Sequence, residues 1–308
     1  PPAACLQNNT VLYAYSTDID YDTYNSGVYQ ITHIARYTTM ATVRFDTKQE
    51  EEIKYNTDYT SLSNSLDSHQ PNPSLGYGDK TTGSNLYTVL KKFLNNGKVS
   101  ICGAQVFIAV KRYPDESDVS DIITQLRSNH VFVYIAVDSV PSGGSNSGSL
   151  YEMSYQTNGY CLFGTGSDLS TGFIVMMNIL DTNYQFLAQN YVVSGSGRIE
   201  TPAFKTPTPV GWVEIGQLAI TVQNHALDNS FVSMNYTFES TDGSHVFQFP
   251  SWEANLLYGT AETASVDLNP SVAYKWTIDY HYNTDAPQII QLRMYSNFYH
   301  DFLPLPGF

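Results

Sequence analysis

Short apolar runs alternate with amphipathic segments over the first two thirds of the chain, which predicts strands alternating with helices. The near-continuous apolar runs at 105–110 and 131–137 are typical of buried parallel strands. Residues 10–15 and 160–163 predict further strands, and 40–47 with 51–55 predicts an antiparallel hairpin. This order of elements indicates an α/β domain with a doubly wound, mostly parallel sheet.

The clearest helix covers residues 86–94, before Asn-Asn-Gly ends it. Its apolar side chains recur at helical spacing: Leu86, Val89, Leu90, Phe93 and Leu94. The same reasoning predicts helices at four more places, which are 24–35, 116–127, 150–155 and 170–190. Residues 56–84 are rich in Ser, Asn, Asp, Pro and Gly, and we expect them to form a loop.

The pattern changes to strands and turns from about residue 192. Six strand-like runs follow, at 213–222, 231–239, 246–249, 265–268, 274–282 and 288–295. In the run 274–282 large apolar residues alternate with polar ones, so one face of that strand should be buried. We therefore predict two domains, an α/β domain over residues 1–190 and an antiparallel β-sandwich over 191–308.

The charge balance argues against nucleic acid as a partner. Lys plus Arg number 15 against 29 Asp plus Glu, a net charge of -14 that repels phosphate backbones and anionic membrane surfaces. No apolar run approaches the roughly 18 residues that span a bilayer. The 24 tyrosines suit a contact surface, because the ring supplies area and the hydroxyl a hydrogen bond.

Two features of the sequence favour a secreted, extracellular protein. The opening Pro-Pro-Ala-Ala-Cys is expected of a mature end after signal-peptide removal, and Asn8 and Asn235 lie in glycosylation sequons. Cys5 and Cys102 each precede an apolar run, and they could pair if those strands are parallel neighbours. The odd cysteine, Cys161, is expected to be a buried thiol, with a bridge to another chain as the alternative.

The α/β part resembles a von Willebrand factor type A (VWA) domain in its order of elements, most closely from Val106 to Val137. The whole chain resembles a nematode family of secreted proteins that pair a degenerate VWA-like domain with a CUB-like β-sandwich. The stretches 192–200 and 227–231 are typical of that family. Some relatives append lectin domains.

The resemblance implies a divalent-cation site at the carboxyl ends of the strands, with hard oxygen ligands that suit Mg²⁺. The first motif, Asp-x-Ser-x-Ser, has Tyr15 in place of Asp and Ile19 in place of the last Ser. No Asp follows the later strand, where Lys111 and Arg112 stand instead. Thr82 or Ser84 could fill the Thr position. We therefore expect the metal site to be lost, and no cofactor.

Asp18, Asp20 and Asp22 form an Asp-x-Asp-x-Asp run at the same end of the sheet. The run could hold a displaced Ca²⁺ or Mg²⁺ ion, but it lacks the Gly and Glu that an EF-hand requires. We favour an acidic loop that caps the following helix.

No catalytic motif such as Gly-x-Ser-x-Gly occurs, so we expect a non-catalytic protein that makes protein–protein contacts or assembles with itself. The contact surface would be the loops at the strand carboxyl ends. Those loops include Ser16, Thr17, Thr82, Asn85, Ser142 and Asn146. The alternatives are a lectin-like or defence-related binder of a glycan or other ligand, and a hydrolase with dispersed catalytic residues.

Overall fold

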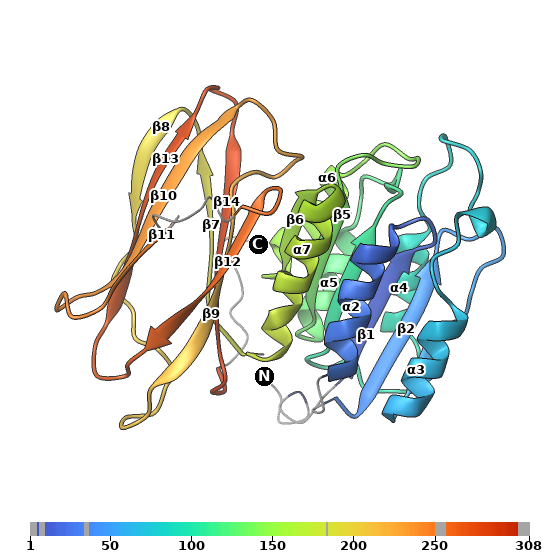
Figure 1. Ribbon diagram of the computed structural model, residues 1–308, viewed down its shortest axis with the longest axis horizontal. Helices are drawn as coiled ribbons and strands as arrows, with labels where there is room; N and C mark the ends of the chain where they lie inside the picture. The colour runs from blue at the N-terminus through green and yellow to red at the C-terminus, as the bar shows by residue number, and fades with distance from the viewer. Residues whose placement is uncertain (1–4, 6–9, 34–36, 183, 250–256, 301–308) are drawn as a thin grey trace. The chain divides into compact units, whose positions relative to one another are not determined.

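The computed structural model describes residues 5, 10–33, 37–182, 184–249 and 257–300 (Figure 1). The chain divides between Leu180 and Asp181 into two compact units, called unit 1 and unit 2 below. Unit 1 combines a sheet with helices, and unit 2 consists of antiparallel sheets, so the predicted fold class is confirmed.

The sheet of unit 1 has the strand order β3-β2-β1-β4-β5-β6. The strands are β1 (Thr10–Ser16), β2 (Thr39–Phe45), β3 (Lys54–Asn56), β4 (Gln105–Val110), β5 (Phe132–Asp138) and β6 (Tyr160–Gly164). All neighbours run parallel except β2 and β3, which form the expected antiparallel pair. The central strands β1 and β4 are buried along their whole length, because helices cover both faces of the sheet.

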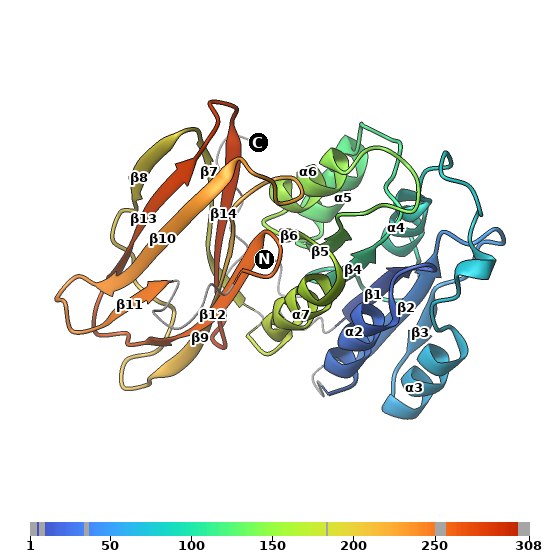
Figure 2. The same cartoon turned by 45° about the horizontal axis from the view of Figure 1, so that its top comes forward.

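The helices of unit 1 are α2 (Tyr21–His33), α3 (Tyr59–Ser68), α4 (Leu86–Leu94), α5 (Ser120–Ser128), α6 (Gly148–Gln156) and α7 (Gly166–Met177). Helices α2 and α7 lie side by side over one face of the sheet, and α4 and α5 lie side by side over the other (Figures 1 and 2). None of the described helices has the length and apolar character that crossing a bilayer requires.

Two expectations about secondary structure were wrong. The stretch 56–84 contains helix α3, which Asp58 caps by accepting a hydrogen bond from the Ser61 N–H at 2.9 Å. Leu62 and Leu66 are the buried residues of this otherwise polar helix, so its apolar signal is weak. The helix expected over 170–190 ends at Met177, and the residues from Tyr184 onward form the first strand of unit 2.

A disulfide joins Cys5 to Cys102, with their Cα atoms 4.8 Å apart. The two cysteines precede β1 and β4, which are parallel neighbours in the sheet, as the pairing argument required. Cys161 lies fully buried in β6 and takes no part in this bridge.

Unit 2 packs two four-stranded antiparallel sheets, ordered β11-β10-β13-β8 and β12-β9-β14-β7. Their strands are β7 (Tyr184–Val193), β8 (Ser196–Glu200), β9 (Glu214–Thr221), β10 (Phe231–Ser240), β11 (Val246–Phe249), β12 (Ala261–Leu268), β13 (Tyr274–Tyr282) and β14 (Gln288–Ser296). The six predicted runs all occur, whereas β7 and β8 were not anticipated.

The core of unit 2 lies between its sheets and is aromatic. Tyr274, Trp276 and Ile278 alternate along β13 with partly exposed residues and are fully buried, which confirms the period of two. Phe238 on the neighbouring strand stacks on Tyr274 with ring centroids 4.6 Å apart.

Candidate functional site

The carboxyl ends of the parallel strands gather residues from three separate segments around one buried carboxyl group. Asp46, directly after β2, accepts hydrogen bonds from the Ser16 hydroxyl at 3.0 Å and from the Ser84 hydroxyl at 2.6 Å. The Asn85 backbone N–H donates to Asp46 at 3.1 Å, and the Asn85 side-chain oxygen accepts from the Asp46 N–H at 2.9 Å. The predicted residues Ser16, Ser84 and Asn85 thus meet at Asp46, which no sequence motif marks.

Burial controls the charge of this carboxyl group. Asp46 is fully buried, and the loss of hydration raises its pKa to about 7. The hydroxyls of Ser84 and Ser16 oppose that rise in pKa, because their hydrogen bonds favour the anion. Near neutral pH the group therefore populates both its charged and its neutral form.

Two cations at this edge are held by other groups of the protein. The Lys111 ammonium lies 2.7 Å from a carboxylate oxygen of Asp138, across the ends of β4 and β5. The buried Arg112 guanidinium donates to the backbone oxygens of Thr82 at 2.6 Å and Asp79 at 2.8 Å. Arg112 therefore fastens the loop 79–82 with two charge-assisted hydrogen bonds.

The oxygen atoms around Asp46 do not fit a divalent cation. Both serine hydroxyls donate to the carboxylate, and each accepts from a backbone N–H, Ser16 from Lys111 at 2.9 Å and Ser84 from Leu86 at 3.1 Å. The lone pairs that a hard cation would use are thus largely directed at protein hydrogen atoms. Over the described part of the chain, no three His, Cys, Asp or Glu side chains gather as metal ligands would.

The three aspartates of the Asp-x-Asp-x-Asp run do not converge on one point. Asp20 caps helix α2, because its side-chain oxygens accept from the Thr23 N–H at 2.8 Å and from the Thr23 hydroxyl at 2.7 Å. Asp22 lies exposed in the first turn of α2, where its charge suits the helix dipole. Asp18 is half-buried in the loop before them.

The remaining predicted contact residues hold their loops in place. Thr17 donates from its hydroxyl to Asn72 O at 2.9 Å, and the exposed Thr82 donates to an Asp79 carboxylate oxygen at 2.9 Å. The loop 141–148 carries the other two residues. The Ser142 N–H donates to Lys111 O at 3.0 Å, and the Asn146 side chain donates to Glu116 O at 2.8 Å.

Gly144 explains why the loop 141–148 can lie so close to the connection that follows β4. Its φ is 71°, in the left-handed region that favours glycine, and a Cβ atom there would stand 1.8 Å from Tyr113 O. Gly144 and the hydrogen bonds of Ser142 and Asn146 therefore fix the loop 141–148 against its neighbours.

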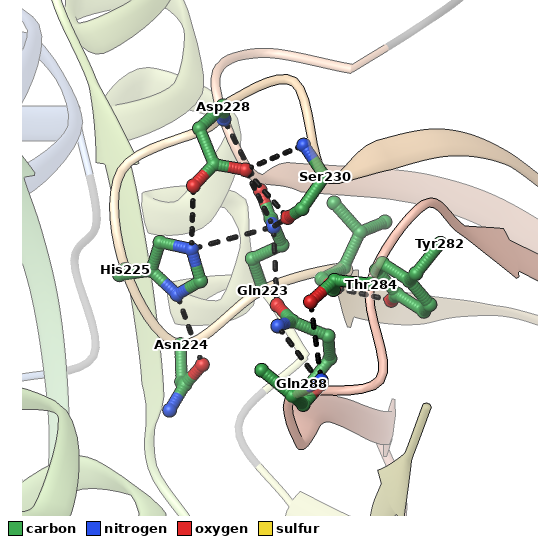
Figure 3. A network of polar contacts seen from close by, with 10 residues as sticks. Gln223, Asn224, His225, Asp228, Ser230, Tyr282, Thr284 and Gln288 are labelled. Atoms are coloured by element: carbon green, nitrogen blue, oxygen red, sulfur yellow. Dashed lines mark hydrogen bonds and ion pairs between the residues drawn. The ribbon is translucent and has the colours of Figure 1, made fainter. Parts of the chain in front are cut away.

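A second polar cluster lies at one end of unit 2, in the connections after β9 and β13 (Figure 3). Its hub is the fully buried Gln223, whose side-chain nitrogen donates to the Ser230 hydroxyl at 2.7 Å and to Gln288 Oε1 at 3.1 Å. The same nitrogen lies 3.3 Å from an oxygen of Asp228. Gln223 thus links the β9–β10 connection to the start of β14.

Ser230, His225 and Asp228 have the residue types of a hydrolytic triad but not its geometry. The Ser230 hydroxyl donates to Asp228 at 2.5 Å, and the His225 ring lies 3.1 Å from the other oxygen of Asp228 (Figure 3). A triad needs the serine to donate to the histidine. Here both residues turn to the aspartate, so the serine has no base to activate it.

Asp228 is the anionic centre of this cluster. Hydrogen bonds from the hydroxyl and the backbone N–H of Ser230 lower its pKa to about 2, and partial desolvation opposes them. The stretch 227–231, which carried part of the family resemblance, therefore folds as a loop fixed by Asp228.

The structure describes one of the two asparagines that we predict to be glycosylated. Asn235 lies exposed on β10, opposite Asp279 of β13. Asn8 lies outside the described residues.

Residues 189–297, which include the Asp228 cluster, match the model of a family described as "Domain of unknown function (DUF7154)". No curated protein matches the chain.

Solved structures resemble the chain at low identity. A von Willebrand factor type A protein from Catenulispora acidiphila is 9% identical, with a TM-score of 0.40; the match covers 94% of this chain and 58% of that protein. BatB from Bacteroides thetaiotaomicron is 11% identical over 56% of this chain and 98% of its own, with a TM-score of 0.37. A carbohydrate-binding module (CBM6) of LamC from Zobellia galactanivorans is 12% identical over 37% of this chain and 93% of its own, with a TM-score of 0.23. The strand order of the two units by itself shows an α/β fold followed by an all-β fold.

Proposed function

We propose that this chain is a non-catalytic, secreted protein-interaction module, with its contact surface on the carboxyl-edge loops of unit 1. Those loops are residues 16–22, 81–85 and 141–148. One observation carries the proposal: three charged groups central to this edge, Asp46, Lys111 and Arg112, are engaged by other groups of the protein. Hydrogen bonds and an ion pair within the protein therefore order the loops before a partner binds, and this order needs no metal ion.

Preorganisation of this kind favours binding because less loop entropy is lost on association. The surface also carries apolar contact groups at its rim. The Tyr21 side chain is 56% exposed and the Val140 side chain is 59% exposed, so both are accessible to a partner. Tyrosine is enriched at protein interfaces, because its ring supplies apolar contact area and its hydroxyl can form a hydrogen bond.

An extracellular setting agrees with two features. The Cys5–Cys102 disulfide forms and persists most readily in an oxidising compartment. The sequon residue Asn235 is exposed on its strand, where a glycan could be attached.

The test compares two double variants of the tagged 308-residue chain. Tyr21→Arg with Val140→Arg alters the carboxyl edge. Tyr29→Arg with Val246→Arg alters two other large exposed apolar residues, 52% and 51% exposed. The native mass of each is measured by size-exclusion chromatography with light scattering, with and without chelator. Partners from the native extracellular fluid are then identified after crosslinking.

We expect a self-associated species or a defined partner that survives the chelator, is lost in the edge variant and persists in the control. A monomer that captures no protein in any buffer would overturn the proposal. Binding that responds only to glycan arrays would replace it with the lectin-like alternative.

A further inference from the structure

The outermost strand of the unit 1 sheet, β3, lies between two grooves. It pairs with β2 along one edge, and within the described residues no strand pairs with its other edge. A shallow, open groove of about 550 Å³ is lined by residues of β3 and α4, and a shallower one of about 520 Å³ by residues of β3 and α3. Ile53, Tyr55 and Lys98 line both grooves, so the grooves meet at the strand.

Lysines concentrate around β3 in an otherwise acidic protein. The net charge is -14, yet four of the nine lysines line the two grooves: Lys54, Lys91, Lys92 and Lys98. Lys91 and Lys92 are paired with nearby carboxylates, at 2.7 Å to Asp121 and 2.9 Å to Glu50. Over the described part of the chain, Lys54 and Lys98 have no carboxylate within ion-pair distance. Two ammonium groups on either side of Tyr55 are therefore available to an anionic ligand.

The other polar groups of the grooves are largely used within the chain. Asn95 donates its side-chain N–H to Lys91 O at 2.8 Å, and the Asn96 side-chain oxygen accepts from the Lys98 N–H at 2.6 Å. The Lys98 ammonium lies over the Tyr55 ring, 5.4 Å from its centroid. One exposed carboxylate, that of Glu52, also lines a groove, 3.6 Å from the Lys92 ammonium, so four lysines stand against one carboxylate in the lining. A neutral sugar would need amide groups and an open aromatic face, whereas lysines are the commonest charged residues of these grooves.

We propose that an acidic, extended segment of a partner protein binds here by adding a strand to β3, with its carboxylates on Lys54 and Lys98. In strand addition, main-chain hydrogen bonds supply affinity and pockets for alternate side chains supply specificity. Successive side chains of a strand point to opposite faces, so an added strand would place alternate residues in the two grooves. The inference does not depend on the carboxyl-edge surface.

A second copy of β3 suits this edge poorly. The strand has three residues, and Lys54 sits on it; short, lysine-bearing edges discourage pairing between copies. A strand rich in carboxylates would instead be attracted by the charge of Lys54, because opposite charges on paired strands stabilise each other.

The experiment measures binding by fluorescence anisotropy of a labelled peptide that alternates Glu and Thr, with a Gln-Thr peptide as the neutral control. The unsubstituted 308-residue chain is compared with Lys54→Glu/Lys98→Glu and with Lys48→Glu/Lys205→Glu, and the second pair makes the same charge change at exposed sites outside the grooves. We expect the groove variant to raise the Kd of the Glu-Thr peptide by about tenfold or more, and the control by less than about twofold.

Hydrogen exchange of the amides 54–56 then separates strand addition from loose attraction. We expect those amides to become protected when the Glu-Thr peptide binds to the wild-type chain. Equal weakening by both variants, or binding without protection at β3, would overturn the proposal. So would a heparin oligosaccharide that binds more tightly than the peptide and loses that binding in the groove variant, since the ligand would then be an anionic glycan.

Discussion

Asp46 in unit 1 and Asp228 in unit 2 both accept hydrogen bonds from serine hydroxyls, yet their pKa values shift in opposite directions. Asp46 is fully buried and its pKa rises to about 7, whereas Asp228 keeps about half of its side-chain exposure and its pKa falls to about 2. The serine contacts alone do not account for the difference. Access to water decides it, because desolvation penalises the anion more than two or three hydrogen bonds repay.

The two carboxyl groups fix their loops in different ways. In unit 1 a carboxyl group that is partly neutral near pH 7 holds three segments together at the end of a sheet. In unit 2 an exposed anion organises its own connection and relies on the buried Gln223 to join that connection to β14. We expect the first to respond to pH between acid and neutral, and the second only in strong acid.

The largest effect should come from Asp46→Asn. The folded pKa of about 7 exceeds the ordinary 3.8, so the contribution of Asp46 to the stability of unit 1 is greatest below pH 4 and falls as pH rises toward 7. The loss amounts to about 4 kcal/mol by pH 7, and the amide variant should abolish it. Urea unfolding followed by helical circular dichroism checks this, because all described α-helices lie in unit 1.

Asp22→Asn, on an exposed position of helix α2, is the control and should keep the wild-type pH profile. An Asp46→Asn protein that is less stable than wild type by the same amount at pH 5 and pH 8 would show that the folded carboxyl group is charged throughout.

Gln223→Ala should destabilise unit 2 by about 2 kcal/mol, because it leaves the buried Gln288 and the hydroxyl of Ser230 without their donor. Tryptophan fluorescence reports this unit alone, since all three tryptophans follow residue 181. The neighbouring variant Asn224→Ala should cost much less. Equal losses of unfolding free energy for the two variants would contradict the central role of Gln223 in this cluster.

Ser84→Ala should cost unit 1 about 1–2 kcal/mol by removing a hydroxyl that donates to the buried carboxylate. The loss should be larger at pH 8 than at pH 5, because the hydrogen bond favours the charged form and its removal raises the pKa of Asp46 further. Helical circular dichroism during urea unfolding at the two pH values measures it. A loss that is independent of pH would argue that Ser84 acts through packing alone.

Asp228→Asn should have the smallest effect. Its depressed pKa contributes stability that is present above about pH 4 and is lost as pH falls toward 2. Solvent screening at this exposed site should hold the contribution below about 1 kcal/mol. Tryptophan-detected unfolding at pH 6 and pH 3 tests it. A pH-dependent loss as large as that of Asp46 would contradict the role assigned to hydration.

Much of the fold was predictable because its signals are local. The apolar runs of β4 and β5, the helical spacing of α4 and the alternation of β13 each lie within one short segment. Helix α3 escaped prediction because two buried leucines carry its whole apolar face. The residues of the carboxyl edge were partly predictable, since the ends of parallel strands gather at one edge of a sheet.

The sequence by itself determined the two-part architecture, the acidic charge and the placement of Cys5 and Cys102 before two apolar, strand-like runs. Only the tertiary structure decided that Asp46 would be the centre of the carboxyl edge and that Asp228, His225 and Ser230 would form a loop support without triad geometry. The physical reason is that the charge of a carboxyl group depends on what covers it. That covering is supplied by segments distant in sequence, such as those bearing Ser16 and Ser84, which meet Asp46 only after the chain has folded.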